Sequence, residues 1–247
     1  MAVPQRQKQP QASRARRNGP DCARDARAER AREATRAEIS RAALQLFLDE
    51  GYERVSMRRI ADAVGYTPGA LYAYFRDKDE ILYALHVEGF ARLRAAIRGI
   101  DALGLAPGER MFKLGQQYLR FAFENPRLYE LMFITSRVGE RIRLDKKWEV
   151  GLDNYEHLRG AVRECMAAGV LTRGDVEAAT FAVWAEVHGI ASAVIRGRTH
   201  SVIADRELPR VVRDAYRFAF GGLLRRPATQ KSQRPSGAAR KSRRRMS

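Results

Sequence analysis

The sequence has little cysteine and little histidine, and these shortages exclude several kinds of site. Only two cysteines, Cys22 and Cys165, and four histidines occur in 247 residues. Two cysteines cannot build a disulfide framework or a cysteine-rich metal site. The histidines are isolated from one another in the chain, so we expect no metal site and no cofactor.

Long hydrophobic runs are also missing. The first thirty residues contain no continuous apolar segment, which argues against a secretory signal. No stretch approaches the ~18 uncharged apolar residues that a membrane-spanning helix requires. We therefore expect no membrane segment and a cytoplasmic location.

Signatures of catalysis are absent as well. We find no nucleophile–base pair, no paired carboxylates and no glycine-rich phosphate loop. The glycines of "DALGLAPGE", residues 101–109, are not preceded by a strand, as a dinucleotide-binding loop would be. The sequence therefore disfavours an enzyme.

Positive charge is concentrated at the two ends of the chain, whose formal net charge is +17. Residues 1–33 carry +5 and residues 224–247 carry +9, which leaves only +3 for residues 34–223. The ends have too little apolar surface to fold, so we expect a disordered basic N-terminal arm and a disordered basic C-terminal tail. They either keep the protein soluble or add salt-sensitive attraction to nucleic-acid phosphates.

The apolar residues that follow the arm have helical spacing nearly everywhere, and no run alternates as a strand does. The sequence therefore predicts an all-α fold of about nine helices. Several helix starts carry a side-chain cap, namely Thr35 with Glu38, Ser56, Thr67 before Pro68, and Asp77 with Glu80. Residues 136–147 are too highly charged to assign.

Residues 56–75 have the layout of a helix-turn-helix, with a tight turn at Gly65. Within them the stretch "VGYTPGALYAYF" contains no charged residue. Leu71 and Phe75 share the inward face of the second helix, so Gly69 and Ala73 lie on the outward face. So small a face lets a helix enter a DNA major groove. Taken one residue at a time, tight packing in an ordinary helical domain is the better explanation, but the whole pattern is more specific.

Polar groups around this helix suit the binding of DNA phosphates. Thr67 and the free N–H groups at the helix start can bind a phosphate, and Tyr72 and Tyr74 can donate hydroxyls. Lys78 follows as a positive anchor. The predicted DNA-binding residues are Ser56, Arg58, Thr67, Pro68, Gly69, Ala70, Tyr72, Ala73, Tyr74 and Lys78.

The stretch "MRRIADAVGYTPGALYAYFRDKDEIL" closely resembles the DNA-binding domain of the tetracycline-repressor (TetR) family of bacterial transcriptional regulators. The resemblance covers about residues 32–92, and its glycines, aromatic residues and lysine all fall in register. Tyr66 stands where a smaller aliphatic residue is usual in the family, and Tyr74 where histidine is common. The resemblance implies a helix-turn-helix DNA-binding domain over residues 34–92.

The later stretch "FAVWAEVHGIASAVIRG" resembles the Trp-x-x-x-His-Gly signature of one C-terminal domain class of the same family, in Trp184, His188 and Gly189. This resemblance implies an effector-binding and dimerisation domain over residues 93–223. It also implies that two copies associate through helices at about 174–196 and 207–224. Both segments are apolar enough to bury one face in a core and another against a partner.

Methionine and aromatic residues of this second domain can line a pocket for a largely apolar effector, although most of them serve as plain core. The predicted ligand-binding residues are Phe121, Met132, Tyr155, Trp184 and His188.

The resemblance implies a ligand-responsive regulator, a repressor by family analogy, that binds a palindromic operator on double-stranded DNA as a dimer and is released by a small effector. The alternative is a sequence-tolerant nucleic-acid-binding protein driven by its basic tails. That protein would lose DNA binding on removal of residues 1–33 and 224–247, whereas an operator reader would keep its sequence preference.

Overall fold

The structure is a computed structural model that describes residues 20–134 and 149–224 of the chain. These residues form nine α-helices and a few short helical turns, and they contain no strand beyond one isolated bridge between Leu171 and Leu224. The all-α prediction is therefore confirmed. Residues 136–147, to which the sequence assigns no secondary structure, lie outside the described residues, as does the basic tail after Leu224.

The first helix, α1 (Pro20–Leu46), is much longer than predicted. The predicted start at Thr35 is wrong, because Thr35 lies inside α1 and its hydroxyl donates to the Ala31 carbonyl at 3.1 Å. The first part of α1 is rich in Ala, Arg and Glu, which favour a helix without any buried face. Consequently residues 20–33 are helical rather than disordered, and only residues 1–19 of the predicted arm lie outside the described residues.

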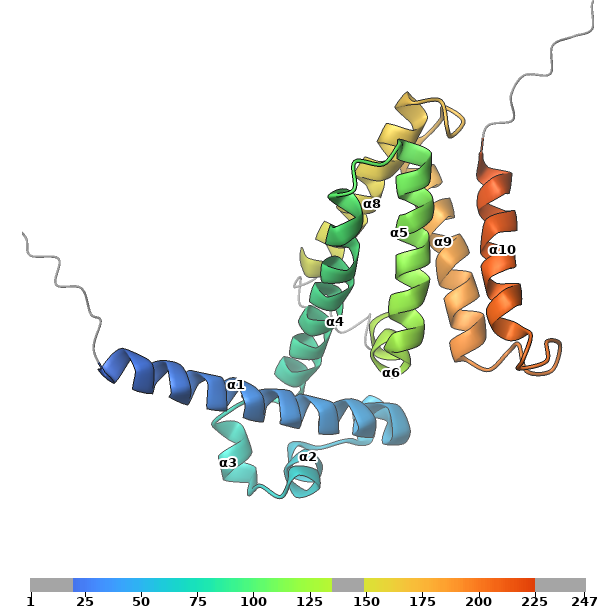
Figure 1. The fold of residues 1–247 in the computed structure, drawn as a ribbon. Coiled ribbons are helices and arrows are strands. Elements are labelled where there is room, and N and C mark those ends of the chain that lie inside the picture. The colour runs from blue at the N-terminus through green and yellow to red at the C-terminus, as the bar shows by residue number, and fades with distance from the viewer. Residues whose placement is uncertain (1–19, 135–148, 225–247) are drawn as a thin grey trace, which may run out of the picture.

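Two short helices, α2 (Met57–Val64) and α3 (Pro68–Tyr72), lie beneath α1 in Figure 1. The predicted caps of these two helices are confirmed: the Ser56 side chain accepts from the Arg59 amide at 3.1 Å, and Thr67 accepts from the Ala70 amide at 3.2 Å. Gly65 ends α2 at φ +72°, a left-handed backbone that glycine adopts without strain. This glycine makes the tight turn between the two helices.

The helix α4 (Lys78–Asp101) connects the two parts of the molecule. Its first half places Ile81 and Leu85 in an apolar core shared with α1, α2 and α3. Its second half places Phe90 and Leu93 in a second, larger core. The predicted domain boundary after residue 92 therefore falls inside a helix that both cores share.

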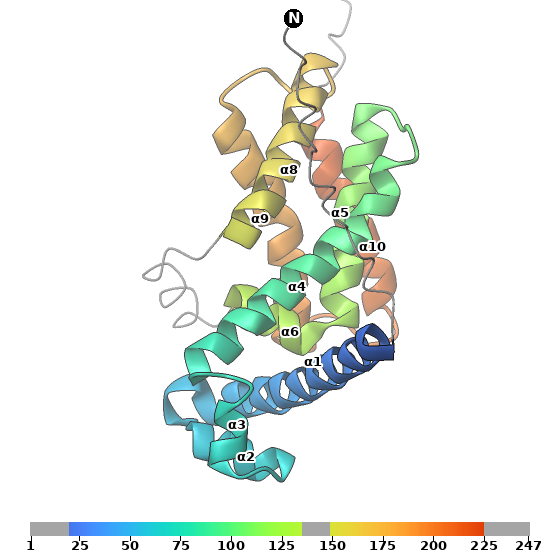
Figure 2. The ribbon, with the colours of Figure 1, turned by 90° about the vertical axis from the view of Figure 1, so that its left-hand side faces the viewer.

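The second core is a helical bundle, seen from two sides in Figures 1 and 2. The helix α5 lies in its middle and contacts α4, α8 and α9, while α10 packs on α9. The turn α6 and the π-helical turn η3 connect this bundle to α1 and α4. The bounds are α5 (Pro107–Glu124), α6 (Pro126–Tyr129), η3 (Glu130–Ile134), α8 (Glu149–Ala167), α9 (Val176–Ile195) and α10 (Leu208–Leu223).

The expectation that no segment approaches a membrane span needs correction for α9. This helix of 20 residues is long and apolar enough by length and composition alone. A single such helix is weak evidence for a span, because core helices of soluble proteins meet the same criteria. Only 17% of its most apolar window is buried within the chain, so α9 has an apolar face that its own bundle leaves uncovered.

Candidate DNA-binding surface and effector pocket

The outward face of α3 is small and exposed, as predicted. Gly69 and Ala73 are exposed, and Tyr72 beside them is 55% exposed. Leu71 and Phe75 anchor the helix from the other side, because both are buried in the first core. The helix therefore presents a shallow, uncharged ridge at the end of the molecule farthest from the bundle (Figure 1).

Two arginines of α1 hold the C-terminal end of α3 in place. Arg32 donates to the Ala73 carbonyl at 2.9 Å, and Arg36 donates to the Tyr74 carbonyl. The Arg36 guanidinium also lies 4.0 Å from the centre of the Phe75 ring. Positive charge suits the carbonyl end of a helix, so α1 acts as a brace for α3.

This brace was not foreseen from the sequence. Its arginines lie 38 and 41 residues before their carbonyl partners, so no local pattern reports the contact. Tyr74, predicted to donate to a phosphate, is half-buried, and its ring lies 5.6 Å from the Arg32 guanidinium carbon. Its carbonyl is thus part of the brace, while its ring packs beside it.

Lys78, predicted as a phosphate anchor, is engaged inside the protein. Its ammonium donates to the carbonyls of Tyr52 at 2.9 Å and of Val55 at 3.2 Å. The ammonium also lies 4.3 Å from the centre of the Tyr52 ring. These contacts fix the turn that leads into α2, so we leave Lys78 out of the phosphate-binding set proposed below.

The remaining predicted contacts surround α3. Ser56, Thr67 and Pro68 are exposed at the starts of α2 and α3, and Ala70 is half-buried. Arg58 on α2 is exposed and forms no ion pair with another described residue. The neighbouring Arg59, in contrast, pairs with Glu50 at 2.7 Å. Arg58 is therefore the cation of α2 that is free to meet a phosphate.

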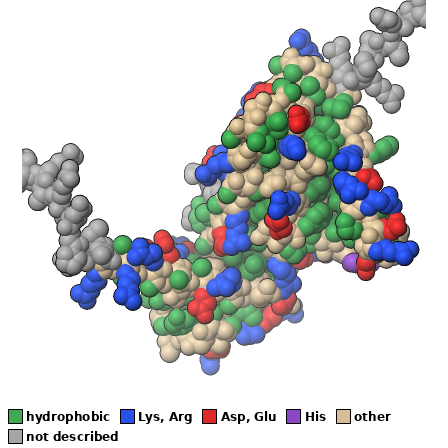
Figure 3. Space-filling view, viewed as in Figure 1, with side chains coloured by type: hydrophobic (Ala, Val, Ile, Leu, Met, Phe, Trp, Pro, Cys, Tyr) green, Lys and Arg blue, Asp and Glu red, His purple; other side chains and the backbone are tan. Residues whose placement is uncertain are grey.

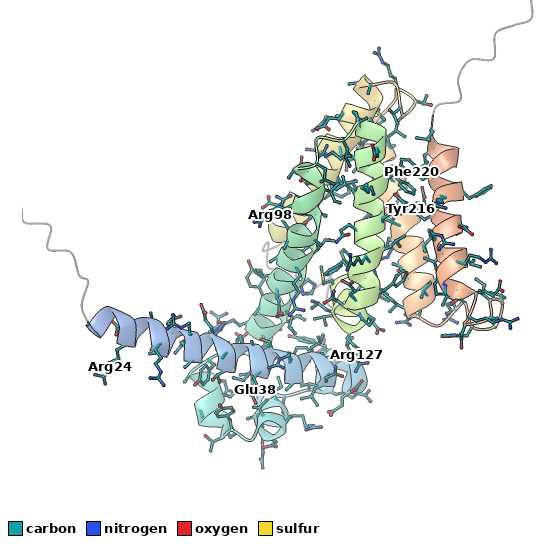
Figure 4. The ribbon with its side chains drawn as sticks, viewed as in Figure 1. Arg24, Glu38, Arg98, Arg127, Tyr216 and Phe220 are labelled. Carbon is teal, nitrogen blue, oxygen red and sulfur yellow. The ribbon has the colours of Figure 1, made fainter. Side chains whose placement is uncertain are left out.

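A cavity of about 520 Å³ lies in the second core, between α4, α5, α8, α9, α10 and η3. Its lining is predominantly apolar and aromatic. Tyr216 and Phe220 of α10 point toward α5 in Figure 4 and belong to this lining. The volume and the lining suit a small, largely apolar molecule.

The cavity brings together three of the five predicted ligand-binding residues. Met132, Tyr155 and Trp184 line it, from η3, α8 and α9 respectively. Phe121 is buried in the surrounding core but does not line the cavity. His188 does not line it either, because the residue stands behind Trp184, whose ring stacks on the imidazole at 4.7 Å.

His188 belongs to a chain of polar groups that sequence reasoning missed. The Tyr118 and Tyr129 hydroxyls are 3.0 Å apart, and the Tyr129 hydroxyl lies 2.7 Å from His188 Nδ1. The other imidazole nitrogen lies 3.2 Å from the Ser192 hydroxyl. Burial raises the pKa of Tyr129 to about 12 and lowers the pKa of His188, so both groups are neutral near pH 7. This hydrogen-bonded group of side chains therefore holds His188 against Trp184 in the cavity wall, and it brings no charge to the cavity.

The described residues contain no group of three or more His, Cys, Asp or Glu side chains that could hold a metal ion. Cys165 of α8 is buried, and its Sγ lies 3.2 Å from the Pro107 carbonyl oxygen. Burial raises the pKa of its thiol to about 11, which keeps it protonated and unreactive.

Both halves of the chain match known protein families. Residues 39–85 match the family described as "Bacterial regulatory proteins, tetR family". Residues 111–235 match the "Tetracyclin repressor-like, C-terminal domain". The first match covers most of the core around α2 and α3, and the second covers the bundle from the first turn of α5 onward.

Individual relatives agree with these matches. The HTH-type transcriptional repressor AcnR of Corynebacterium glutamicum is 28% identical over 140 residues, which are 55% of this chain and 66% of that protein. This chain thus spans just under two thirds of that relative. The TetR family transcriptional regulator PfmR of Thermus thermophilus superposes with a TM-score of 0.59 at 28% identity, over 76% of this chain and 96% of that one.

A further structural neighbour shows the fold alone. The fatty acid degradation regulator FadR of Bacillus halodurans has a TM-score of 0.61 over 76% of this chain and 95% of that one, at 20% identity. Its two-part helical architecture is the one described above. With both halves matched, this chain belongs to the tetR family of bacterial regulatory proteins.

Proposed function

We propose that the protein is a dimeric transcriptional repressor that reads a near-palindromic operator and releases it when a small effector enters the cavity. The observation that carries this proposal is the small, exposed face of α3, held from behind by Arg32 and Arg36. A braced helix with glycine and alanine outward can approach base edges closely. The relative AcnR is a transcriptional repressor, which supports repression rather than activation.

Exposed side chains around α3 complete the proposed DNA contact. Gly69, Ala73 and Tyr72 face the groove, and Thr67 and Arg58 lie where the phosphate backbone would pass. Phosphate contacts fix the register of the protein, whereas contacts to base edges read the sequence. In a symmetric dimer each copy places one α3 in a major groove, with half-sites about one helical turn or more apart.

The proposed dimer forms through the uncovered faces of α9 and α10. Helically spaced small and apolar residues are exposed along both helices: Ala178, Ala182 and Gly189 on α9, and Ala215, Phe218 and Gly222 on α10. Phe218 is 86% exposed, which is costly for a side chain of that size in water. Two such helices from each copy can form a four-helix bundle with small residues at the contact.

The effector signal is proposed to travel along α4. Phe90 and Ile97 of α4 line the cavity, while Leu82 of the same helix is buried in the core that supports α3. An effector that wedges α4 away from the bundle therefore moves the DNA-binding core of each copy. In a dimer this changes the distance between the two α3 helices and favours the state that does not fit the operator.

The turn η3 gives the same signal a second contact with the DNA-binding core. Leu131 is buried in that core, while its neighbour Met132 lines the cavity. Met132 also packs directly against Gly89 of α4, where even one additional carbon atom would collide with its sulfur. Displacement of Met132 by an effector would therefore act on α4 and on Leu131 together.

The groove assignment is tested by placing a negative charge on α3. Ala73→Asp puts a carboxylate at the outward face, where it would meet base edges and phosphates of the operator. We expect specific operator binding to be lost, with the fold and the oligomeric state unchanged. The control, Ala95→Asp, adds the same charge to an exposed position of α4.

Binding is measured by fluorescence anisotropy on an operator obtained by selection, and folding by circular dichroism. Wild-type affinity in the Ala73→Asp protein would show that α3 does not enter the groove. An equal loss in the Ala95→Asp protein would show that any added negative charge has the same effect.

A further inference from the structure

The cavity contains one acidic side chain and, among the described residues, no lysine or arginine. That acid is Glu186 of α9. The lining also includes His157, but its Nε2 lies 3.3 Å from Asp101, and burial lowers the pKa of the imidazole. The cavity is therefore largely apolar. Glu186 is the acidic group in its described lining, and that lining holds no lysine or arginine.

Glu186 combines a buried carboxylate oxygen with the lack of any hydrogen-bond or ion-pair partner among the described residues. Its Oε1 is enclosed and accepts no hydrogen bond from any described residue. Glu164 and Glu177, in contrast, pair with Arg110 and Arg159. Burial raises the pKa of Glu186, because the charged carboxylate loses contact with water and no donor replaces it.

Neighbouring hydroxyl donors do not relieve this shortage. Tyr216, also in the cavity wall, donates its hydroxyl to the Phe112 carbonyl at 3.0 Å, so that proton is not directed at Glu186. The Tyr118 hydroxyl is engaged with Tyr129. A buried carboxylate oxygen without a donor is unfavourable in the empty protein, and a ligand that brings a donor removes the penalty.

We propose that the effector is a cationic amphiphile, whose apolar body fills the cavity and whose protonated amine pairs with Glu186. The inference rests on the proposed role of the cavity as the effector site. A charge-assisted hydrogen bond from an ammonium group is stronger than one from a neutral donor, so an amine suits a carboxylate oxygen that lacks a donor. An amphiphile with a carboxylate head would instead meet a like charge with no described cation to offset it.

The test uses the full chain and isothermal titration calorimetry with matched probes. Decylamine, decanol and decanoate share one straight apolar body, and an amine, an alcohol and a carboxylate on a naphthylethyl body form a second series. The two series cover an elongated and an aromatic shape, so the head group is the variable that is compared. Each probe is titrated into wild type, Glu186→Gln and Glu124→Gln.

We expect an amine to bind at least about 10-fold more tightly than the alcohol on the same body, and the carboxylate to bind more weakly than both. Glu186→Gln should remove the advantage of the amine and leave the alcohol unchanged. Glu124→Gln makes the same substitution at an exposed carboxylate that pairs with Arg120 on α5, outside the cavity, and should keep the advantage.

Three outcomes would refute the proposal that the effector is a cationic amphiphile. They are carboxylates that bind as tightly as amines, an amine advantage that survives Glu186→Gln, and no binding of any probe. Operator binding without a probe is measured in parallel on the same preparations. Loss of sequence-specific operator binding would refute the proposed function. The preference for amines is read from calorimetry without DNA, so the two failures are distinguishable.

Discussion

His86 is a buried histidine of α4 at the place where the two cores meet. Its Nδ1 lies 3.1 Å from the Leu82 carbonyl, so this nitrogen carries the proton and donates within the helix. Burial lowers the pKa of the imidazole to about 4, against the weaker opposing effect of the Leu82 and Met132 carbonyls. The side chain is therefore neutral in the folded protein near pH 7.

This histidine predicts a loss of stability in mild acid. Between its ordinary pKa of about 6.5 and the folded value of about 4, the unfolded chain binds a proton that the folded chain does not. The free energy of unfolding should therefore fall as pH decreases through this range, by about 3 kcal/mol from His86 alone. His86→Leu should remove that part of the decrease.

The measurement is urea unfolding of wild type and His86→Leu between neutral pH and the folded pKa of His86. His200→Gln, at an exposed histidine paired with Asp205, serves as the control and should follow wild type. If wild type and His86→Leu lose the same stability on acidification, His86 is not the buried neutral group described above.

At the scale of elements, the contact between α1 and α3 sets the position of the helix that we propose enters the DNA groove. Arg36→Ala removes a donor to the Tyr74 carbonyl, the stacking on Phe75 and an ion pair with Glu80 at 3.4 Å. We expect operator affinity to fall by about 10-fold, since about 1–2 kcal/mol of bracing is lost.

The matched control for the brace is Arg41→Ala. Arg41 is an exposed arginine of the same helix, and among the described residues its side chain bonds only to the Ala37 carbonyl of α1. Anisotropy titrations on the selected operator compare the two variants. Equal affinities for Arg36→Ala and wild type would mean that α3 keeps its position without α1.

Figures 3 and 4 show how far α1 projects beyond this contact. Arginine side chains gather on its projecting part, and Arg24 points to the side of α1 where α3 lies. At its other end, Arg127 of α6 donates to Gln45 at 2.6 Å and so joins α1 to the bundle. A shortened chain that begins at residue 34 would cut α1 and remove Arg32, so DNA-binding tests need the full helix.

The elements that the sequence predicted well are those specified locally. The caps at Ser56, Thr67 and Asp77 lie three residues from the amides they accept from, so their patterns are readable in the chain. The start of α1 was missed, because its projecting part has no apolar face that would reveal a helical period.

The parts of the site that escaped prediction depend on contacts distant in sequence. Lys78 reaches carbonyls 23 and 26 residues earlier in the chain, and Tyr129 meets His188 59 residues later. Glu186 was not among the predicted ligand residues, because neither residue type nor spacing shows whether a carboxylate has a partner in the folded protein. These contacts depend on how distant segments pack together, and that packing cannot be obtained from a single sequence.

At the scale of the whole molecule, the proposed dimer predicts the behaviour of Phe218. Phe218→Glu places a charge in the middle of the exposed stripe of α10, and burial of that charge against a second copy is strongly unfavourable. We expect the variant to be a monomer that binds the operator much more weakly, because each copy contacts only one half-site.

Sedimentation equilibrium on the full chain measures the association directly. Leu103→Glu is the matched control: this leucine is 57% exposed in the turn between α4 and α5, away from α9 and α10. A Phe218→Glu protein that still sediments as a dimer would place the interface elsewhere. A monomeric wild type would refute the proposed dimer outright.

The central claim is that α3 gives the protein a sequence preference that the basic ends of the chain cannot supply. The most direct measurement is selection from random duplex DNA with the full-length protein, followed by titrations of the selected sequence at several salt concentrations. We predict enrichment of a palindrome that is bound far more tightly than scrambled DNA of the same length. If no sequence is enriched and all binding falls steeply with salt, phosphate attraction by the basic ends carries the affinity and the account is contradicted.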